Sequence, residues 1–508
     1  MYGDAATPYP VEMRGIKPLP GTGPSSPTSP IQMSRKSSVE ITEGDLQVYP
    51  SPLHVHAVFL CHGLWGEPSH MYALRDALKS RADREDVAVS IHCCSSYRGK
   101  LSYDGVDVCA DRVVDEVQHE VDQLKIVGKR VVRFSILGYS LGGLIARLAV
   151  FLLNSHSFFE RIQPCNFTTI ASPAIGLPLA PGFIPKKIRA ISAFFLSRTG
   201  THLFLTDKGQ GSKIPLIQEL STPRYTRVLA NFERVDIYAN AILDRMVPYV
   251  AGGITTDDPF MEALATAGDE IHRVPTETSL TLDRLQLVFD ERYPDLISTV
   301  ETIPKDEMKS VPKSNLLSAD RPKSTLIPCI APLRPWFTPS TYPFLPRPLR
   351  PVLVGTIPLV IPAVLLVVVT FTIQGVKSRI RIKRHFRHRA GRTWKSRVWD
   401  DLEDHIQPPS RSWTAATTNS TSTGSTVVHV NTNDLYPTRK AGLGSNLSTA
   451  QHDMIDALNK SIPNMKKHVA FFPGVFTSHT VIVCQDQHNI VHRRGLAIVQ
   501  HWADIFQL

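Results

Sequence analysis

Residues 134–150 constrain the fold more than any other part of this chain. An apolar, β-branched run ends at Gly138, and apolar residues recur at helical spacing after Gly143. The pentapeptide at 138–142, Gly-Tyr-Ser-Leu-Gly, therefore lies where a strand turns sharply into a helix. Glycines flank the serine because a side chain there would collide with the neighbouring strand or helix. The pattern predicts a nucleophile elbow that exposes the oxygen of Ser140; a plain glycine-rich turn is the alternative.

Strands and helices alternate around this elbow. Strand-like apolar runs lie at residues 56–61, 87–93, 131–137, 167–173 and 235–240, and helix-like periodic segments lie at 69–79 and 105–127. This alternation predicts an α/β fold, in which a mostly parallel sheet is covered by helices on both faces. The 508 residues, 42% of them hydrophobic, leave room for one large α/β domain and substantial additions.

Composition divides the chain into five segments. Residues 1–43 are rich in Pro, Ser, Gly and Thr and are predicted to be disordered. Residues 44–305 form the first part of the predicted α/β domain, and residues 456–508, where strand-like and helix-like patterns return, form its C-terminal part. Between them lie a proline-rich, apolar and basic insert at 306–399 and a polar Ser/Thr-rich linker at 400–455.

Neither the cysteines nor the start of the chain indicates secretion. The seven cysteines are odd in number and have neither disulfide-framework nor zinc-ligand spacing, which suits a reducing compartment. The first thirty residues contain charges and many prolines but no apolar core of a cleaved signal. We therefore expect the α/β domain to face the cytosol.

A serine nucleophile requires a base and an acid that orients the base. At neutral pH a serine hydroxyl needs a histidine to take its proton, and a carboxylate usually holds that histidine. On a fold with this elbow the chain order is serine, acid, histidine. Asp244 fits the acid, because it lies in the loop after the strand at 235–240. Asp236, inside that strand, is less free to reach the site, and a turn aspartate is the alternative role for Asp244.

The base is harder to select, because the chain contains nineteen histidines. Chain order excludes every histidine before Asp244, and several later ones lie in proline-rich, basic or linker sequence. His479 lies in the loop after the strand-like run at 469–472, where such a fold presents its base. We therefore select His479, with His488 and His492 as alternatives; a loop histidine without a catalytic role is the other interpretation of each.

The chemistry also needs donors for the oxyanion of a tetrahedral intermediate. One is expected to be the backbone N–H of Leu141, directly after the nucleophile. The second is expected in the loop after His62-Gly63, which follows the early strand at 56–61, and the simplest choice is the N–H of Leu64. An ordinary turn at the end of a strand is the alternative interpretation of His62-Gly63.

Four motifs together resemble a fungal family of serine esterases with lipase-like members. They are His-Gly-Leu-Trp-Gly at 62–66, the elbow at 138–143, Tyr-Ala-Asn at 238–240 with Asp-Arg-Met-Val-Pro-Tyr at 244–249, and Ser-His at 478–479. The resemblance covers about residues 50–300 and 460–508. It implies an α/β-hydrolase fold, a triad of Ser140, Asp244 and His479, and glycerolipid substrates, as in a lipid-droplet phospholipase or a monoacylglycerol lipase. No metal or organic cofactor is required.

An apolar segment and a basic run indicate a lipid surface as partner. Residues 352–373 contain no charge and are long enough to cross a bilayer. Residues 377–397 contain ten Lys or Arg and no acid, which accounts for the whole formal charge of +10. The position of the basic run after the apolar segment favours anionic lipid head groups over nucleic acid. A lipid droplet or the endoplasmic reticulum membrane is the expected location.

A single crossing by residues 352–373 would separate His479 from Ser140 and Asp244. The segment is therefore predicted to enter and leave on one face as a re-entrant hairpin, with the helix broken at Pro351, Pro358 and Pro362. A buried core helix is the alternative. A second apolar stretch, residues 182–205, is predicted to form either a lid over the acyl pocket or a core helix.

These features predict a serine hydrolase that cleaves carboxylic ester bonds of glycerolipids, as a phospholipase or acylglycerol lipase at a membrane or lipid-droplet surface. A serine acyltransferase would use the same fold and triad. A non-catalytic scaffold that keeps the fold and binds lipid through the apolar segment is the alternative from another class.

Overall fold

The computed structural model describes residues 53–178, 195–207, 214–261, 279–282, 285–302, 357–390 and 447–508. The predicted disordered segment at 1–43, the proline-rich part of the insert, most of the polar linker and most of the predicted lid lie outside these residues. The described end of the predicted lid forms α5 (Ser197–Leu203).

A nine-stranded sheet organises the described residues, in the order β2-β1-β3-β4-β5-β9-β8-β7-β6. Six of its strands are parallel: β1 (Leu53–Cys61), β2 (Val89–Cys93), β3 (Lys129–Tyr139), β4 (Gln163–Ile170), β5 (Arg234–Asn240) and β9 (Met465–Ala470). The predicted mostly parallel sheet is therefore confirmed. Three antiparallel strands extend it beyond β9: β6 (Ser279–Leu282), β7 (Leu285–Phe289) and β8 (Leu296–Thr302).

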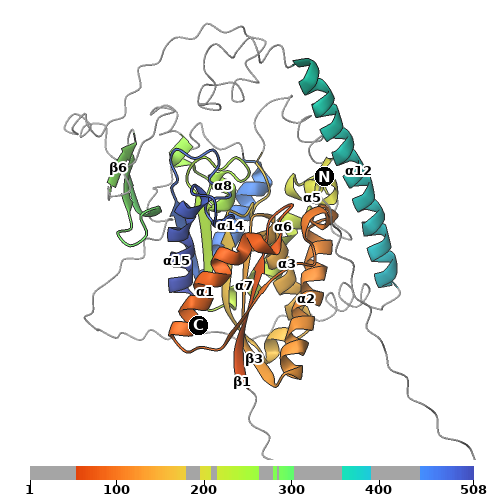
Figure 1. Cartoon of the computed structure of the whole chain (residues 1–508), viewed down its shortest axis with the longest axis vertical. Coiled ribbons are helices and arrows are strands. Elements are labelled where there is room, and N and C mark those ends of the chain that lie inside the picture. Colours follow the sequence, from red (N-terminus) through yellow and green to blue (C-terminus); the bar gives the residue numbers. More distant parts are fainter. Residues whose placement is uncertain are drawn as a thin grey trace, which may run out of the picture. The chain divides into compact units, whose positions relative to one another are not determined.

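Helices cover both faces of the sheet (Figure 1). One apolar core lies under α2 (Val106–Ile126), α3 (Leu141–Ser155), α7 (Pro223–Ala230) and α14 (Thr449–Ser461). The other lies under α1 (Tyr72–Arg84) and α15 (Leu496–Ile505), which pack against each other. Two short helices complete the described part of this region: α6 (Leu216–Leu220) precedes α7, and α8 (Tyr249–Gly252) lies after β5. Because α3 is buried on all sides, its sequence is almost continuously apolar.

The C-terminal segment completes the sheet that the first half of the chain begins. Strand β9 pairs in parallel with β5, with Asn240 opposite Ala470, although more than 200 residues separate them in sequence. Helix α14 leads into β9, and the N-terminus of α14 is capped by a capping box of Ser448 and Gln451. Residues 481–484 form a series of buried turns. The loop that carries His479 is thereby brought to the end of β5.

Residues 357–373 of the apolar segment and residues 377–390 of the basic run lie in one helix, α12 (Ile357–Ala390). The predicted break at Pro358 and Pro362 is wrong, because the helix continues through both. Pro358 lies in the first turn, where its missing N–H has no intrahelical acceptor, but Pro362 lies further inside. Among the helices of the described ranges, none is long and apolar enough to cross a membrane. Helix α12 packs against α5 (Figure 1). It also packs against the 3-10 helix η2 (Gly99–Asp104).

Two buried neutral histidines make the stability of the fold depend on pH. His56 contacts Ser135 Oγ at 2.8 Å, and His501 contacts the Tyr238 hydroxyl at 2.8 Å. Burial, reinforced by nearby cations, lowers the pKa of His56 and that of His501 each to about 3. In the unfolded chain a histidine has a pKa of about 6.5. Below pH 6.5 these two histidines bind protons in the unfolded state but stay neutral in the folded state. The free energy of unfolding therefore falls as the pH drops from 6.5 toward 3.

We expect each of these histidines to contribute a slope of up to about 1.4 kcal/mol per pH unit between pH 6 and 4.5. Urea unfolding of wild type and of His501→Gln at pH 7, 6, 5 and 4.5 measures it. The variant is expected to be less stable at pH 7 and to lose less stability on acidification. Equal slopes for the two proteins would contradict this origin of the acid sensitivity.

Candidate active site

Ser140 lies at the sharp turn between β3 and α3. Its backbone has φ 54°, a left-handed conformation that costs energy for a residue with a side chain. The turn is closed by glycines: a Cβ at Gly142 would collide with the carbonyl oxygens of Cys61 and His62, and one at Gly138 would collide with the backbone of Gly142. The sequence pattern of the elbow therefore corresponds to a real steric requirement.

The structure brings Ser140, His479 and Asp244 together. The Oγ of Ser140 lies 2.9 Å from Nε2 of His479, and Nδ1 of the same ring lies 3.0 Å from Oδ2 of Asp244. A carboxylate only accepts hydrogen bonds, so the ring proton belongs on Nδ1 and leaves Nε2 free to accept from the serine hydroxyl. The three side chains follow the carboxyl ends of β3, β5 and β9, three parallel strands of one sheet.

Backbone donors and a side-chain amide fix the carboxylate of Asp244. Its Oδ1 accepts from the N–H groups of Met246 at 2.9 Å and Val247 at 2.8 Å, and its Oδ2 accepts from Asn240 Nδ2 at 2.7 Å. The side chain is almost completely buried. These hydrogen bonds therefore set the orientation of the Asp244 carboxylate independently of the His479 imidazole.

The loop that carries His479 is fastened on two sides. Ser478 donates its hydroxyl to Ile242 O at 2.7 Å and its N–H to Leu243 O at 3.1 Å, which ties the loop to the chain just before Asp244. Tyr139, the residue before the nucleophile, donates its hydroxyl to the carbonyl of His479 at 3.0 Å. The elbow thus helps to hold the histidine in place.

The alternative histidines take other positions. His488 is exposed, and His492 lies 3.0 Å from Thr480 Oγ1 and accepts from the N–H of Asp486 at 3.2 Å. His479 is the histidine that meets Ser140 Oγ. Asp236 lies in β5 and accepts hydrogen bonds from Arg234 and His468, away from His479.

The loop at 62–66 lies directly against the nucleophile. A Cβ at Gly63 would come within 2.9 Å of Ser140 Cβ, so only glycine fits. Leu64, the expected second oxyanion donor, follows Gly63 in this loop, and Leu141, the expected first donor, is the first residue of α3. Leu141 therefore lies next to Ser140 in the chain, and Gly63, the residue before Leu64, lies next to Ser140 in the fold.

His62 braces this loop, a role that its position in the motif did not reveal. Its Nδ1–H donates to Gly63 O at 2.9 Å, and its ring lies against that of Tyr97, whose hydroxyl donates to His62 O at 2.7 Å. Burial lowers the pKa of His62 to about 4, so the ring is neutral at pH 7. Tyr97, in the loop after β2, and Tyr139, inside the elbow motif, are further supporting residues whose roles the sequence analysis missed.

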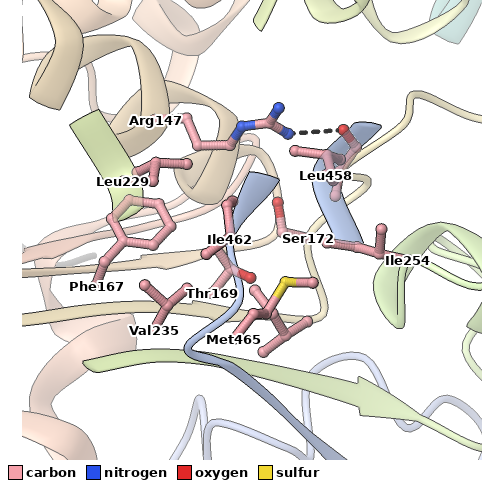
Figure 2. Close-up of a pocket in the computed structure, with 12 residues that line it drawn as sticks. Arg147, Phe167, Thr169, Ser172, Leu229, Val235, Ile254, Leu458, Ile462 and Met465 are labelled. Carbon is pink, nitrogen blue, oxygen red and sulfur yellow. Dashed lines mark hydrogen bonds between the residues drawn. The ribbon is translucent and has the colours of Figure 1, made fainter. Parts of the chain in front are cut away.

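A small cavity lies between the sheet and the helices α3, α7 and α14 (Figure 2). Its lining does not include Ser140, Asp244 or His479. The buried guanidinium of Arg147 borders it and donates to Ala174 O at 2.8 Å and Leu220 O at 3.0 Å. Burial lowers the pKa of Arg147 to about 10. Among the described residues, no cluster of three or more His, Cys, Asp or Glu side chains has the geometry of a metal site.

A mostly parallel sheet with a nucleophile elbow after one strand, and an acid and a histidine in loops after later strands, defines an α/β-hydrolase. Residues 52–257 match the family described as "Putative serine esterase (DUF676)". The resemblance predicted from the sequence motifs is thereby confirmed.

Among curated relatives, the chain is 28% identical over 228 residues to "Putative lipase YDL109C" of Saccharomyces cerevisiae, covering 42% of this chain and 33% of that protein. It is 27% identical over 227 residues to "Putative lipase ROG1" of the same organism, covering 43% and 31%. The chain thus spans about a third of the length of these relatives. Among solved structures it is similar to phospholipase PlaB from Legionella pneumophila, with 16% identity, a TM-score of 0.26 and coverage of 39% of this chain and 41% of that one.

Proposed function

We propose that this protein is a serine hydrolase that cleaves carboxylic ester bonds of glycerolipids, as a phospholipase or an acylglycerol lipase. The observation that carries the proposal is the hydrogen-bonded line from Ser140 Oγ through the His479 imidazole to the Asp244 carboxylate. The family match of the chain and the names of its relatives support the same class of reaction.

In the proposed reaction Ser140 Oγ attacks the carbonyl carbon of the ester while His479 Nε2 takes its proton. The negative charge on the carbonyl oxygen is held by the N–H groups of Leu141 and Leu64. The tetrahedral intermediate collapses to an acyl-enzyme as His479 returns the proton to the departing alcohol oxygen. Water then attacks the acyl-enzyme with His479 as base, releasing the fatty acid and restoring the hydroxyl of Ser140. Asp244 keeps the imidazole in the required tautomer throughout.

The surface of α12 supports a lipid interface as the place of this reaction. The side of α12 that faces the catalytic domain is partly polar: Ser378, Arg381 and His385 hydrogen-bond to it. The opposite side carries apolar residues at alternating spacings of three and four, each 45 to 67% exposed: Leu366, Val369, Ile373, Val376 and Ile380. A helix whose outward face is apolar suits contact with acyl chains better than contact with water.

The same outward side becomes basic in the last turns of α12. The spacing of the apolar residues continues into Lys383 and Arg387, which are both exposed. Cations at this end can pair with anionic head groups, each contributing about 1 kcal/mol near such a surface. We propose that α12 rests on a lipid-droplet monolayer or an endoplasmic reticulum membrane, with the catalytic domain on the cytosolic side.

Labelling of the purified full chain with a fluorophosphonate, followed by incubation with a mixed glycerolipid extract, tests the proposal. Wild type is expected to be labelled and to release free fatty acid, with Ser140→Ala as the background control. Transfer of the acyl chain to another lipid would identify an acyltransferase instead. A folded wild type that binds lipid, takes no label and consumes no lipid would be a scaffold, and the hydrolase proposal would fail.

A further inference from the structure

One buried carboxylate joins α12 to the catalytic domain. Asp104, the last residue of η2, is completely buried and accepts four hydrogen bonds. Ser378 and Arg381 of α12 donate to its Oδ1 at 2.7 and 2.8 Å, and Arg381 also donates to Oδ2 at 3.1 Å. Arg112 of α2 donates to Oδ2 at 2.7 Å. Three of the four bonds therefore come from α12.

Neighbouring contacts extend this attachment along the helix. The buried hydroxyl of Ser378 also accepts from Ser197 of α5 at 3.2 Å, and Arg381 donates to Lys100 O at 3.0 Å. Further along, His385 lies 3.3 Å from an Asp111 carboxylate oxygen on α2. These residues repeat along one side of the helix, so a single orientation of α12 satisfies all of them. A buried charge is costly to leave unpaired, which favours that orientation over others.

From η2 the contacts lead directly into the loop at 62–66. Ser102 of η2 accepts the N–H of Trp65 at 3.0 Å, and Gly99 donates to Gly66 O at 2.8 Å. Trp65 has φ 53°, a conformation that costs energy for a bulky residue and persists only where its surroundings hold it. Helix α12 also reaches this residue itself, because the ring of Phe371 lies 5.8 Å from that of Trp65.

We propose that α12 is a positioning element of the active site. The Asp104 carboxylate and its hydrogen bonds to Ser378, Arg381 and Arg112, together called the socket, attach α12 to η2 and through η2 hold the oxyanion loop at 62–66. The proposal rests on the proposed function in that this loop supplies the N–H of Leu64 to the oxyanion. The outward face of α12 is the one proposed to meet lipid. Seating of the helix on a surface and the geometry of the oxyanion loop therefore depend on one rigid element.

Arg381→Gln tests the socket, because it removes the guanidinium that makes two of the four bonds to Asp104 and leaves a shorter, uncharged polar side chain. Arg130→Gln is the matched control, since Arg130 is an exposed arginine near the start of β3. Loss of one oxyanion donor lowers kcat by about 10²- to 10³-fold in serine hydrolases. For a displaced donor we expect Arg381→Gln to lower kcat on a short soluble ester by about 10- to 100-fold, with KM within about two-fold. Arg130→Gln is expected to match wild type.

Hydrogen exchange of the peptide that covers residues 60–67 provides a readout independent of activity. Exchange there is expected to speed up in Arg381→Gln and to stay at the wild-type rate in Arg130→Gln. If Arg381→Gln fails to fold, Ser378→Ala, which removes one hydrogen bond to Asp104, is used in its place in both measurements. Wild type that hydrolyses no ester would refute the proposed function, and the exchange rates would still decide the coupling. Unchanged exchange at 60–67 in a folded socket variant overturns the inference.

Discussion

A His479→Ala variant is expected to hydrolyse its ester about 10⁴- to 10⁶-fold more slowly than wild type. Without the imidazole at 2.9 Å, nothing takes the proton from Ser140 Oγ during attack, and nothing returns a proton to the departing alcohol. The binding site and the oxyanion donors remain, so the loss should appear in kcat with little change in KM. Steady-state hydrolysis of a soluble chromogenic ester measures both constants.

His488→Ala and His492→Ala are the matched controls, because both residues follow His479 in the same C-terminal segment. The exposed His488 should have no effect, and removal of His492, which contacts Thr480, should lower kcat by no more than about three-fold, since neither ring carries the serine proton. If His492→Ala abolished hydrolysis while His479→Ala retained it, the assignment of the base would be wrong. Thermal unfolding of all three variants separates a loss of chemistry from a loss of fold.

Local signals were sufficient for the elbow. A β-branched run, glycines and a helical period all agree within seventeen residues, and each matches a contact in the structure: a Cβ at Gly138 or Gly142 would meet backbone atoms. The parallel sheet also followed from local patterns, because apolar strands alternate with periodic helices over residues 53–240. Chain order and loop position were enough to select Ser140, Asp244 and His479, which the structure brings together.

Long-range pairing was not predictable in the same way. Nothing in residues 465–470 indicates that β9 pairs with β5 across more than 200 residues, or that β6, β7 and β8 continue the sheet beyond it in antiparallel order. The continuity of α12 was missed because Pro362 is a local helix breaker, whereas contacts of the helix with η2 and α5 are tertiary. Asp104 has no motif around it; its role follows only from the arginines that the fold brings to it.

An Asp244→Asn variant is expected to lose about 10⁴-fold in kcat and almost no stability. The amide can still accept from the N–H groups of Met246 and Val247 through its oxygen. Asn240, which donates to Oδ2 in wild type and whose own Oδ1 has no hydrogen-bond partner, can turn its amide to accept from the new nitrogen, so the loop should keep its shape. The new nitrogen, however, would face Nδ1 of His479 as a donor and favour the tautomer with the proton on Nε2. That tautomer cannot accept the proton of Ser140. Steady-state kinetics together with thermal unfolding measure both effects.

Asp236→Asn is the matched control, because it makes the same substitution at the other aspartate of the β5 region. Burial alone would raise the pKa of Asp236, but hydrogen bonds and charges from His468 and Arg234 outweigh it and lower that pKa. The variant breaks this buried pairing, so it should destabilise the fold by about 3–5 kcal/mol while kcat at a permissive temperature stays near wild type. Opposite outcomes for the two variants would separate the acid that orients the base from the acid that secures the strand. Loss of activity in Asp236→Asn with Asp244→Asn unaffected would reverse the assignment.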